Sequence, residues 1–528
     1  MKGWLWRFVG FGVAWAVLGG VSGATEFTIG GSPASLMGYV NQGVTYGIDK
    51  DDFNNKKGFN SAVFSALLEG DYRPNRDLKF YGAGKITADW AYPLLAGNDE
   101  WKDKEFDESR DEIYLDTGWN KMLHEAHVTW APGGIFVRAG KQIVSWGETD
   151  GFRLMDQINP VDQRRGLGDV EFENTIIPLW LLRVDYYIQP QVGWLQDIGL
   201  ETVFNPNAEF QANRPIDLGN DDSGIWAPNV GVGPLPTEFT LVDTNDDGVP
   251  DTPVPTAFAP GQLGSFHKHK EEPDAWDPSG FEFGARLKAV VSDTIVTLNY
   301  FNGLSNDAQL RIAGPPDLTL APDGKPLLHL PMQYRYPRFR MAGATFTGDF
   351  PSLTASFLGG VAPVLRLEGF YGFQNTFGTD DGFSKYVQRD EVRYIVGVDW
   401  KVKASFLNPK AYFFLSGQFY HRKILDFDSD TPAGQDLKDF LGNVRENNYA
   451  TSLAVNTTYF HNKLTPSFFW LRDISLNGNM YKFQLTYDQS DRWHYILGAL
   501  LLDGNEEAKG FEPLKKKDQV FATIKYRF

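Results

Sequence analysis

The chain has 528 residues, with 50 basic against 67 acidic side chains and no cysteine. The absence of cysteine excludes disulfide frameworks, thiolate metal sites and covalent haem attachment. The net charge of −17 argues against nucleic-acid binding, which depends on basic side chains that neutralise phosphates. The mean hydropathy of −0.33 does not fit a helical membrane protein, but it fits a membrane β-barrel, in which only about half of each strand faces lipid.

The first 24 residues have the pattern of a secretory signal peptide. Two basic residues precede the apolar run 8–21, and small residues follow at 22–24, which predicts cleavage after Ala24. The run is shorter than the roughly 20 apolar residues that a membrane-spanning helix needs. We therefore expect the mature chain to comprise residues 25–528, with a net charge of −19.

Apolar and polar side chains alternate in many segments of the mature chain, including 392–400, 481–488 and 493–501. Successive side chains of a β-strand point to opposite faces, so each segment predicts a strand with one apolar and one polar face. In several of these rows aromatic residues stand at the ends and aliphatic residues in the middle, as in the aromatic girdles of membrane barrels.

The connections between these segments alternate between short and long. The short links lie at 73–76, 132–134, 291–293, 461–463 and 489–491, and the long links at 92–121, 144–177, 205–279, 304–331, 376–387, 424–447 and 504–517. Short periplasmic turns that alternate with long outer loops are typical of transmembrane barrels. The pattern predicts one all-β domain, an antiparallel up-and-down transmembrane barrel of about 18 strands with both termini periplasmic. Sixteen strands is the alternative, because 349–363 reads as a turn, a short helix or another strand.

Residues 144–177, called the internal segment below, follow a predicted strand but lack alternation. They mix charges of both signs, which favours a segment folded into the barrel lumen as a plug that narrows or gates the pore. The alternative is a purely structural prop, because removing one partner of a buried ion network is costly whatever its role. The candidate pore and plug residues here are Trp146, Glu148, Asp150, Arg153, Asn159, Asp162, Arg164 and Arg165.

Around this segment the chain resembles a large family of proteobacterial outer-membrane β-barrel proteins filed as a domain of unknown function. The resemblance rests on GKQIVSWGE at 140–148, INPVD at 158–162 and Pro178-Leu-Trp180. Members are often encoded beside RND-type exporters and a periplasmic carrier, so the resemblance implies these as partners. It also implies movement of hydrophobic or lipid-like molecules through the envelope.

The long link 205–279 is the predicted extracellular loop, and it contains an acidic turn. Asp243, Asn245, Asp247 and Asp251 place oxygen ligands around Gly248, a spacing that wraps a hard cation. The bidentate glutamate of an EF-hand is missing. Two interpretations stay open, a structural calcium site and a polar turn.

Several arginines fall in or beside predicted strands. A charged side chain that faces lipid at mid-membrane costs roughly 2–4 kcal/mol, so most of these arginines should face the lumen and suit anionic or aromatic cargo. The pore-lining candidates among them are Arg338, Arg340, Arg389 and Arg393. Pro337 interrupts the alternation, which leaves open which of its neighbours face inward.

No sequence motif predicts an enzyme. The chain has no nucleophile elbow, zinc-protease helix or phosphate-binding glycine loop. His124 and His127 lie in a predicted strand, where three-residue spacing places them on opposite faces. We therefore predict a protein without a catalytic site and without a cofactor other than the calcium considered above.

The last strand indicates the compartment. From Val520 to Phe528 every second residue is apolar, while Thr523, Lys525 and Arg527 are polar. The segment resembles the C-terminal sorting signal of outer-membrane proteins. Together with the signal peptide it predicts the cell outer membrane, with lipid, lipopolysaccharide and the barrel-assembly machinery as partners.

Three functions follow as hypotheses. The first is a channel or transport conduit for hydrophobic or anionic organic compounds, gated or narrowed by the internal segment. The second is a sheath around a periplasmic partner, such as an electron carrier or an export complex, which requires an open bore. The third is a barrel enzyme, which requires a nucleophile and a histidine within hydrogen-bond reach.

Overall fold

The structure is a computed structural model that describes residues 25–49, 57–95, 119–149, 152–167, 175–216, 226–228, 231–244, 248–320, 324–379, 386–427, 437–439, 442–505 and 510–528. Within these ranges, no helix has the length and apolar character needed to cross a membrane.

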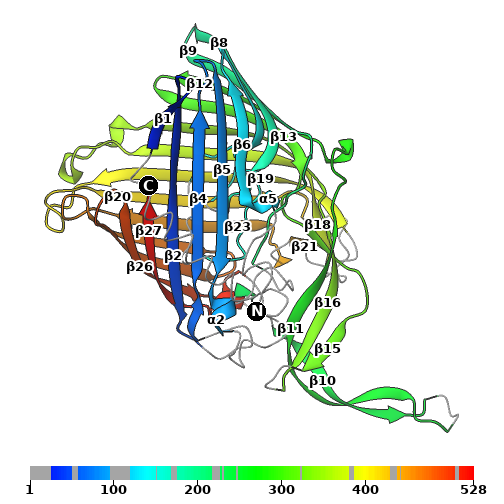
Figure 1. The fold of residues 1–528 in the computed structure, drawn as a ribbon. Coiled ribbons are helices and arrows are strands. Elements are labelled where there is room, and N and C mark those ends of the chain that lie inside the picture. Colours follow the sequence, from blue (N-terminus) through cyan, green and yellow to red (C-terminus); the bar gives the residue numbers. More distant parts are fainter. Residues whose placement is uncertain are drawn as a thin grey trace.

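Eighteen antiparallel strands close into a barrel (Figure 1). In order around the wall they are β2 (Ser32–Gly47), β4 (Val63–Tyr72), β5 (Leu78–Asp89), β6 (Leu123–Trp130), β7 (Ile135–Gln142), β8 (Leu179–Val192), β9 (Leu195–Asn205), β12 (Glu282–Val291), β13 (Thr294–Leu304), β17 (Arg338–Asp349), β18 (Val364–Thr379), β19 (Tyr386–Val402), β20 (Phe413–Ile424), β23 (Asn447–Asn456), β24 (Leu464–Asp473), β25 (Gly478–Asp488), β26 (Trp493–Asp503) and β27 (Gln519–Arg527).

The last strand closes the barrel by pairing with the first long one. β27 pairs with β2 from Tyr39 opposite Arg527 to Gly47 opposite Gln519. The predicted count of 18 strands is confirmed. The ambiguous segment 349–363 holds only the short 3-10 turns η5 (Pro351–Leu353) and η6 (Ser356–Leu358), so it adds no strand to the wall.

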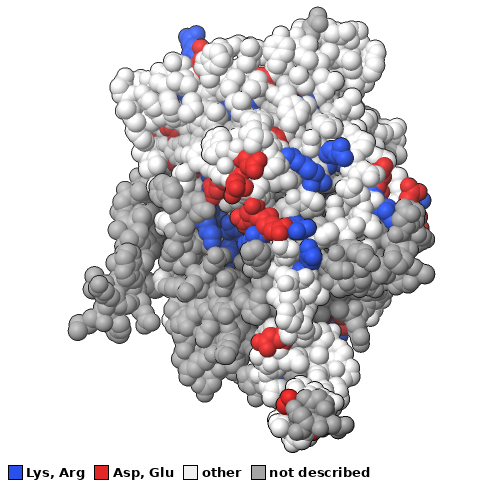
Figure 2. Space-filling view, turned by 90° about the vertical axis from the view of Figure 1, so that its right-hand side faces the viewer, with Lys and Arg blue, Asp and Glu red and all other residues white. Residues whose placement is uncertain are grey.

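Side chains alternate between the outside and the inside of the wall. In β13, Leu298 and Tyr300 are exposed, whereas Thr297 and Asn299 are buried on the inner face. In β27, Val520 and Ile524 are exposed, and Thr523 and Lys525 are buried. Figure 2 shows that the upper part of the face in view is almost uncharged, while acidic and basic side chains gather below it. The outer wall is therefore an apolar belt.

Most connections at one end of the barrel are short, and most at the other end are long (Figure 1). One two-residue connection is Ser292-Asp293 between β12 and β13, where both residues have positive φ angles, 47° and 67°. Such paired left-handed residues are typical of two-residue hairpins whose turn follows the twist of the strands. The predicted alternation of link lengths agrees with this arrangement.

Two of the long connections join to form a second sheet, called the arm below. It consists of β10 (Gly231–Val242), β11 (Thr252–Glu271), β14 (Gln309–Ile312), β15 (Asp317–Leu320) and β16 (Pro326–Arg335). β11 and β16 pair in parallel, and the arm projects from the long-loop end (Figure 1). These strands were not expected from the sequence, because prolines interrupt the alternation of β10 and β11 and proline is usual only at sheet edges.

Candidate functional site

The described part of the internal segment lies against the inner wall of the barrel. Its residues in this contact are Val144, Trp146, Leu154, Met155 and Ile158, all buried. They form one hydrophobic cluster with inward-facing residues of six strands, namely Leu179, Leu181, Val203, Phe301, Phe339, Met341, Phe370 and Ile395. Burial of large apolar side chains stabilises such contacts by about 1.5–3 kcal/mol each, so the segment is packed in place along its apolar side.

Trp146 is fully buried in this cluster. Its indole Nε1 donates a hydrogen bond of 2.9 Å to Glu201 on β9. The ring fits beside Gly284 on β12, where an added Cβ would lie 2.6 Å from the ring atom Cη2. A glycine at this position therefore leaves the space that the indole occupies.

Glu368 on β18 binds the backbone of the internal segment. One carboxylate oxygen accepts hydrogen bonds from the N–H groups of Glu148 at 2.5 Å and Thr149 at 2.8 Å, and from the Thr149 hydroxyl at 3.0 Å. The other oxygen accepts from the N–H of Met155 at 3.2 Å. These four hydrogen bonds hold two stretches of the segment, 148–149 and Met155, against the wall.

Two polar residues fold the segment on itself. Asp156 accepts hydrogen bonds from the N–H groups of Trp146 at 2.7 Å and Gly147 at 2.8 Å. Asn159 is buried, accepts from the N–H of Val144 at 2.8 Å and donates to the carbonyl of Ile177 at 2.9 Å. The two ends of the stretch 144–159 are therefore held side by side.

Charged side chains of the wall pair with the segment as well. Arg286 on β12 forms an ion pair of 3.0 Å with Glu148. Arg366 on β18 donates to the carbonyl oxygen of Glu148 and pairs with Asp399 on β19 at 2.7 Å. Glu148, a predicted plug residue, therefore contacts two arginines of the wall, Arg286 through its carboxylate and Arg366 through its carbonyl oxygen.

A second ion pair lies within the segment. Asp162 pairs with the buried Arg164 at 2.6 Å and with Arg214 at 3.5 Å. Burial alone would raise the pKa of the Asp162 carboxyl, but Arg164, Arg214 and Arg165 together hold that pKa well below its usual range. The carboxyl therefore stays ionised at any physiological pH.

Two predicted candidates of the segment remain, Arg153 and Asp150. Arg153 donates to the carbonyl oxygen of Asn159 at 3.1 Å, and burial lowers the pKa of its guanidinium. Asp150 lies outside the described residues.

The four arginines predicted to line the pore divide into two pairs. Arg389 and Arg393 lie on the inner face of β19, in phase with the buried Glu391 and Ile395. Arg338 and Arg340 lie on the outer face of β17, because Phe339 and Met341 occupy the inward positions. The prediction that Arg338 and Arg340 face the lumen is therefore wrong. Their position at the long-loop end of the strand removes the lipid-exposure cost on which that prediction depended.

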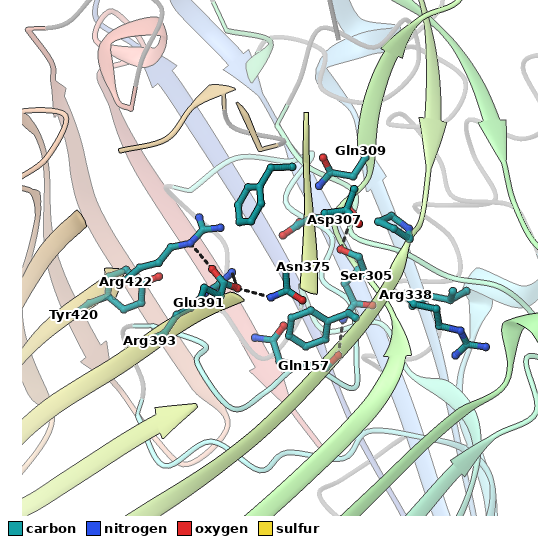
Figure 3. Close-up of a pocket in the computed structure, with 16 residues that line it drawn as sticks. Gln157, Ser305, Asp307, Gln309, Arg338, Asn375, Glu391, Arg393, Tyr420 and Arg422 are labelled. Carbon is teal, nitrogen blue, oxygen red and sulfur yellow. Dashed lines mark hydrogen bonds and ion pairs between the residues drawn. The ribbon is translucent and has the colours of Figure 1, made fainter. Parts of the chain in front are cut away.

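A pocket of about 240 Å³ opens beside the internal segment (Figure 3). Glu391, fully buried on β19, lies at its centre and accepts hydrogen bonds of 2.6 Å from Arg393, Arg422 and Asn375. The aromatic residues that line the pocket are Phe339, Phe377 and Tyr420. Arg338 touches it only at the strand, since its side chain points away in Figure 3 and donates to the carbonyl of Phe281.

A β-bulge in β18 directs Asn375 and Phe377 into the pocket. The pairing of β18 with β19 shifts between Gly372 and Asn375, and Gln374 has a φ of 50°. Bulges are frequent where a strand re-aims a side chain near a functional site. On the outer face, Asp390 accepts hydrogen bonds of 2.8 Å from both the N–H and the side chain of Gln374, and it also accepts from the Tyr371 hydroxyl. The bulge is thus fixed from outside the barrel.

The acidic turn of the arm is only partly described. Asp243 accepts a hydrogen bond of 2.6 Å from the N–H of Gly248, and Asp251 accepts one of 3.1 Å from Thr252. Asn245 and Asp247 lie outside the described residues. Among the residues that are described, no three histidine or acidic side chains cluster as metal ligands would. Calcium at this turn stays a prediction.

Three residues of the site are not among the candidates predicted from the sequence. Glu368, Glu391 and Asp156 accept four, three and two of the hydrogen bonds described above. A signal was present for the first two, since an acidic residue inside an otherwise apolar membrane strand must face the lumen. Asp156 has no such signal, because its role depends on how the irregular backbone around it folds.

Residues 11–528 match the family model DUF1302, which is described as a protein of unknown function. No curated protein matches the chain in sequence. Among solved structures, OccAB1 of Acinetobacter baumannii is similar at 9% identity and a TM-score of 0.44, covering 94% of this chain and 96% of its own. OmpF of Salmonella typhi is similar at 10% identity and a TM-score of 0.39, covering 96% and 100%. At these values nothing about the cargo of this chain follows from the likeness.

Proposed function

The chain belongs to the DUF1302 family, and we propose that it is a gated conduit through the outer membrane, for hydrophobic or anionic organic compounds. The apolar belt outside a closed barrel suits a lipid bilayer. The inner wall carries charged and polar side chains such as Arg366, Glu368 and Glu391, which suits a lumen that takes up water and solutes.

The observation that carries the proposal is the attachment of the internal segment to the wall. Apolar packing holds one side of the segment, and Glu368 and Arg286 hold its backbone and a carboxylate. A polypeptide fixed inside the bore narrows it, and hydrogen bonds of this kind can be made and broken as the segment moves. Release of the segment from Glu368 is the proposed opening step.

A sheath around a periplasmic protein is less well supported. Such a barrel needs an open bore, whereas the described part of the internal segment occupies the lumen side of six strands. The exporter and carrier partners implied by the family resemblance are compatible with a conduit, and we retain them as part of the proposal.

The decisive measurement is single-channel conductance in planar bilayers, for the full chain and for a deletion of residues 145–158. The ends of this deletion are already adjacent, since the N–H of Val144 donates to the side chain of Asn159 at 2.8 Å. We expect a small or intermittent current from the full chain and a large, steady current from the deletion variant.

A deletion of the same length in the arm, residues 241–254, is the matched control and should leave the current unchanged. Absence of current from both the full chain and the 145–158 deletion would contradict the conduit. An equal, steady current from both would contradict gating by the internal segment.

A further inference from the structure

The pocket around Glu391 points to a class of cargo, an inference that deepens the conduit proposed above and rests on it. We propose that this pocket is a binding station for a small organic anion, a carboxylate attached to an aromatic ring or a short apolar group.

The charge of the pocket favours an anion. Arg393 and Arg422 both donate to the single carboxylate of Glu391 at 2.6 Å, so two guanidinium groups share one carboxylate there. Asp307 lies at the rim, where it accepts a hydrogen bond of 2.7 Å from Asn213. A ligand carboxylate would be a second acidic acceptor for the two arginines.

The guanidinium of Arg393 has donors to offer. It has five N–H groups in a planar fork, and one of its terminal nitrogens bonds to Glu391. Its side chain is 23% exposed, against 0% for that of Glu391. Arg393 can therefore keep its bond to Glu391 and donate to a ligand carboxylate at the same time, in the bidentate geometry that arginine favours.

The walls of the pocket select an apolar body. Phe377 lies under the guanidinium of Arg422 at 5.2 Å. Phe339 and Tyr420 line the same space (Figure 3). The volume of about 240 Å³ is below the roughly 300–1,000 Å³ of sites for drug-sized ligands, so the ligand is small.

A ligand in this pocket would touch the internal segment. Gln157 lines the pocket, and Phe152 stacks on Tyr420 with ring centroids 5.4 Å apart. The station is thus formed jointly by the wall and by the segment that narrows the bore.

The test uses benzoate as the probe and benzamide as its uncharged isostere, titrated into the detergent-solubilised full chain by calorimetry. We expect benzoate to bind and benzamide to bind at least about 10-fold more weakly, since hydrogen bonds to a charged group contribute about 1.5–3 kcal/mol. Arg393→Gln should weaken benzoate binding about 10-fold or more. The matched control is Arg340→Gln, which removes the same charge from the outer face of β17 and should leave binding unchanged.

Equal binding of benzoate and benzamide, or no binding of benzoate, would overturn the proposal. So would equal benzoate affinity in Arg393→Gln and in the native chain. If Arg393→Gln fails to form the heat-resistant folded band of a barrel on gels, the benzoate–benzamide comparison on the native chain decides alone. Conductance without benzoate binding would contradict the binding station but not the conduit. Benzoate binding without conductance would contradict the conduit but not the binding station.

Discussion

At the scale of single residues, Glu368 has the largest share in holding the internal segment. It is buried on the inner face of β18 and accepts four hydrogen bonds, three of them from backbone N–H groups. A neutral glutamine would keep one oxygen acceptor and would present an amide N–H₂ to a second donor. The substitution therefore replaces one acceptor oxygen by an N–H₂ group, which would face a backbone N–H of the segment.

We expect Glu368→Gln to raise the open probability of the channel about 10-fold or more, because a buried backbone N–H left without an acceptor costs about 1–3 kcal/mol. Single-channel recording measures this directly. Glu282→Gln is the control, since Glu282 is also buried on the inner face but bonds to Asn205 and Leu304 rather than to the segment. The same rise in both variants would mean that the wall, and not the segment, had been disturbed.

At the scale of elements, the bulge in β18 determines which residues reach the pocket. Before it the even-numbered residues Arg366 and Glu368 face inward, and after it the odd-numbered Asn375 and Phe377 do so. A strict two-residue period read along the sequence would place these last two on the lipid side. The sequence shows the strand but not this change of phase, because the extra residue is stabilised by Asp390 on the neighbouring strand.

Asp390→Ala should loosen the bulge although it lies outside the lumen. Loss of its hydrogen bonds to Gln374 removes about 1 kcal/mol or more, which corresponds to about fivefold faster amide hydrogen exchange in a peptide covering 373–379. Exchange measured by mass spectrometry on the folded barrel tests this. Peptide 479–487 in β25 is the internal reference, and equal changes in both peptides would indicate global rather than local loosening.

At the scale of the whole molecule, the apolar belt fixes how the barrel sits in a bilayer. Leu298 is 58% exposed on the outer face of β13, whereas Phe357, 83% exposed, lies in the connection between β17 and β18. Both residues are exposed and apolar. Leu298 lies on a strand of the apolar belt, whereas Phe357 lies in a connection between strands.

Leu298→Arg should destabilise the barrel in lipid vesicles by about 2–4 kcal/mol, the cost of a charge facing lipid at mid-membrane. Phe357→Arg should change stability by less than about 1 kcal/mol, as near the interface. Denaturant unfolding in vesicles, followed by tryptophan fluorescence, gives both values. Equal costs at the two positions would place the bilayer elsewhere on the molecule.

The sequence predicted this wall well and the lumen less well, for one physical reason. Strand alternation and link length are local properties, so the count of 18 strands could be derived from them. The contacts of Glu368, Glu391 and Asn375 join distant strands and depend on register. The orientation of Arg338 and Arg340 depended on register in the same way, and there the prediction failed.

The hydrogen bond from Glu148 to Glu368 joins residues 220 positions apart, and this separation has a consequence for assembly. The internal segment leaves the wall after β7, while β18 is the sixth strand beyond it. Contacts between residues so far apart form only after the chain between them is ordered. Until β18 has joined, Met155 lacks its hydrogen bond to Glu368, and the apolar cluster around the segment lacks Phe370. A chain stalled before that strand would therefore leave this cluster incomplete, as a binding site for a chaperone and as a starting point for aggregation.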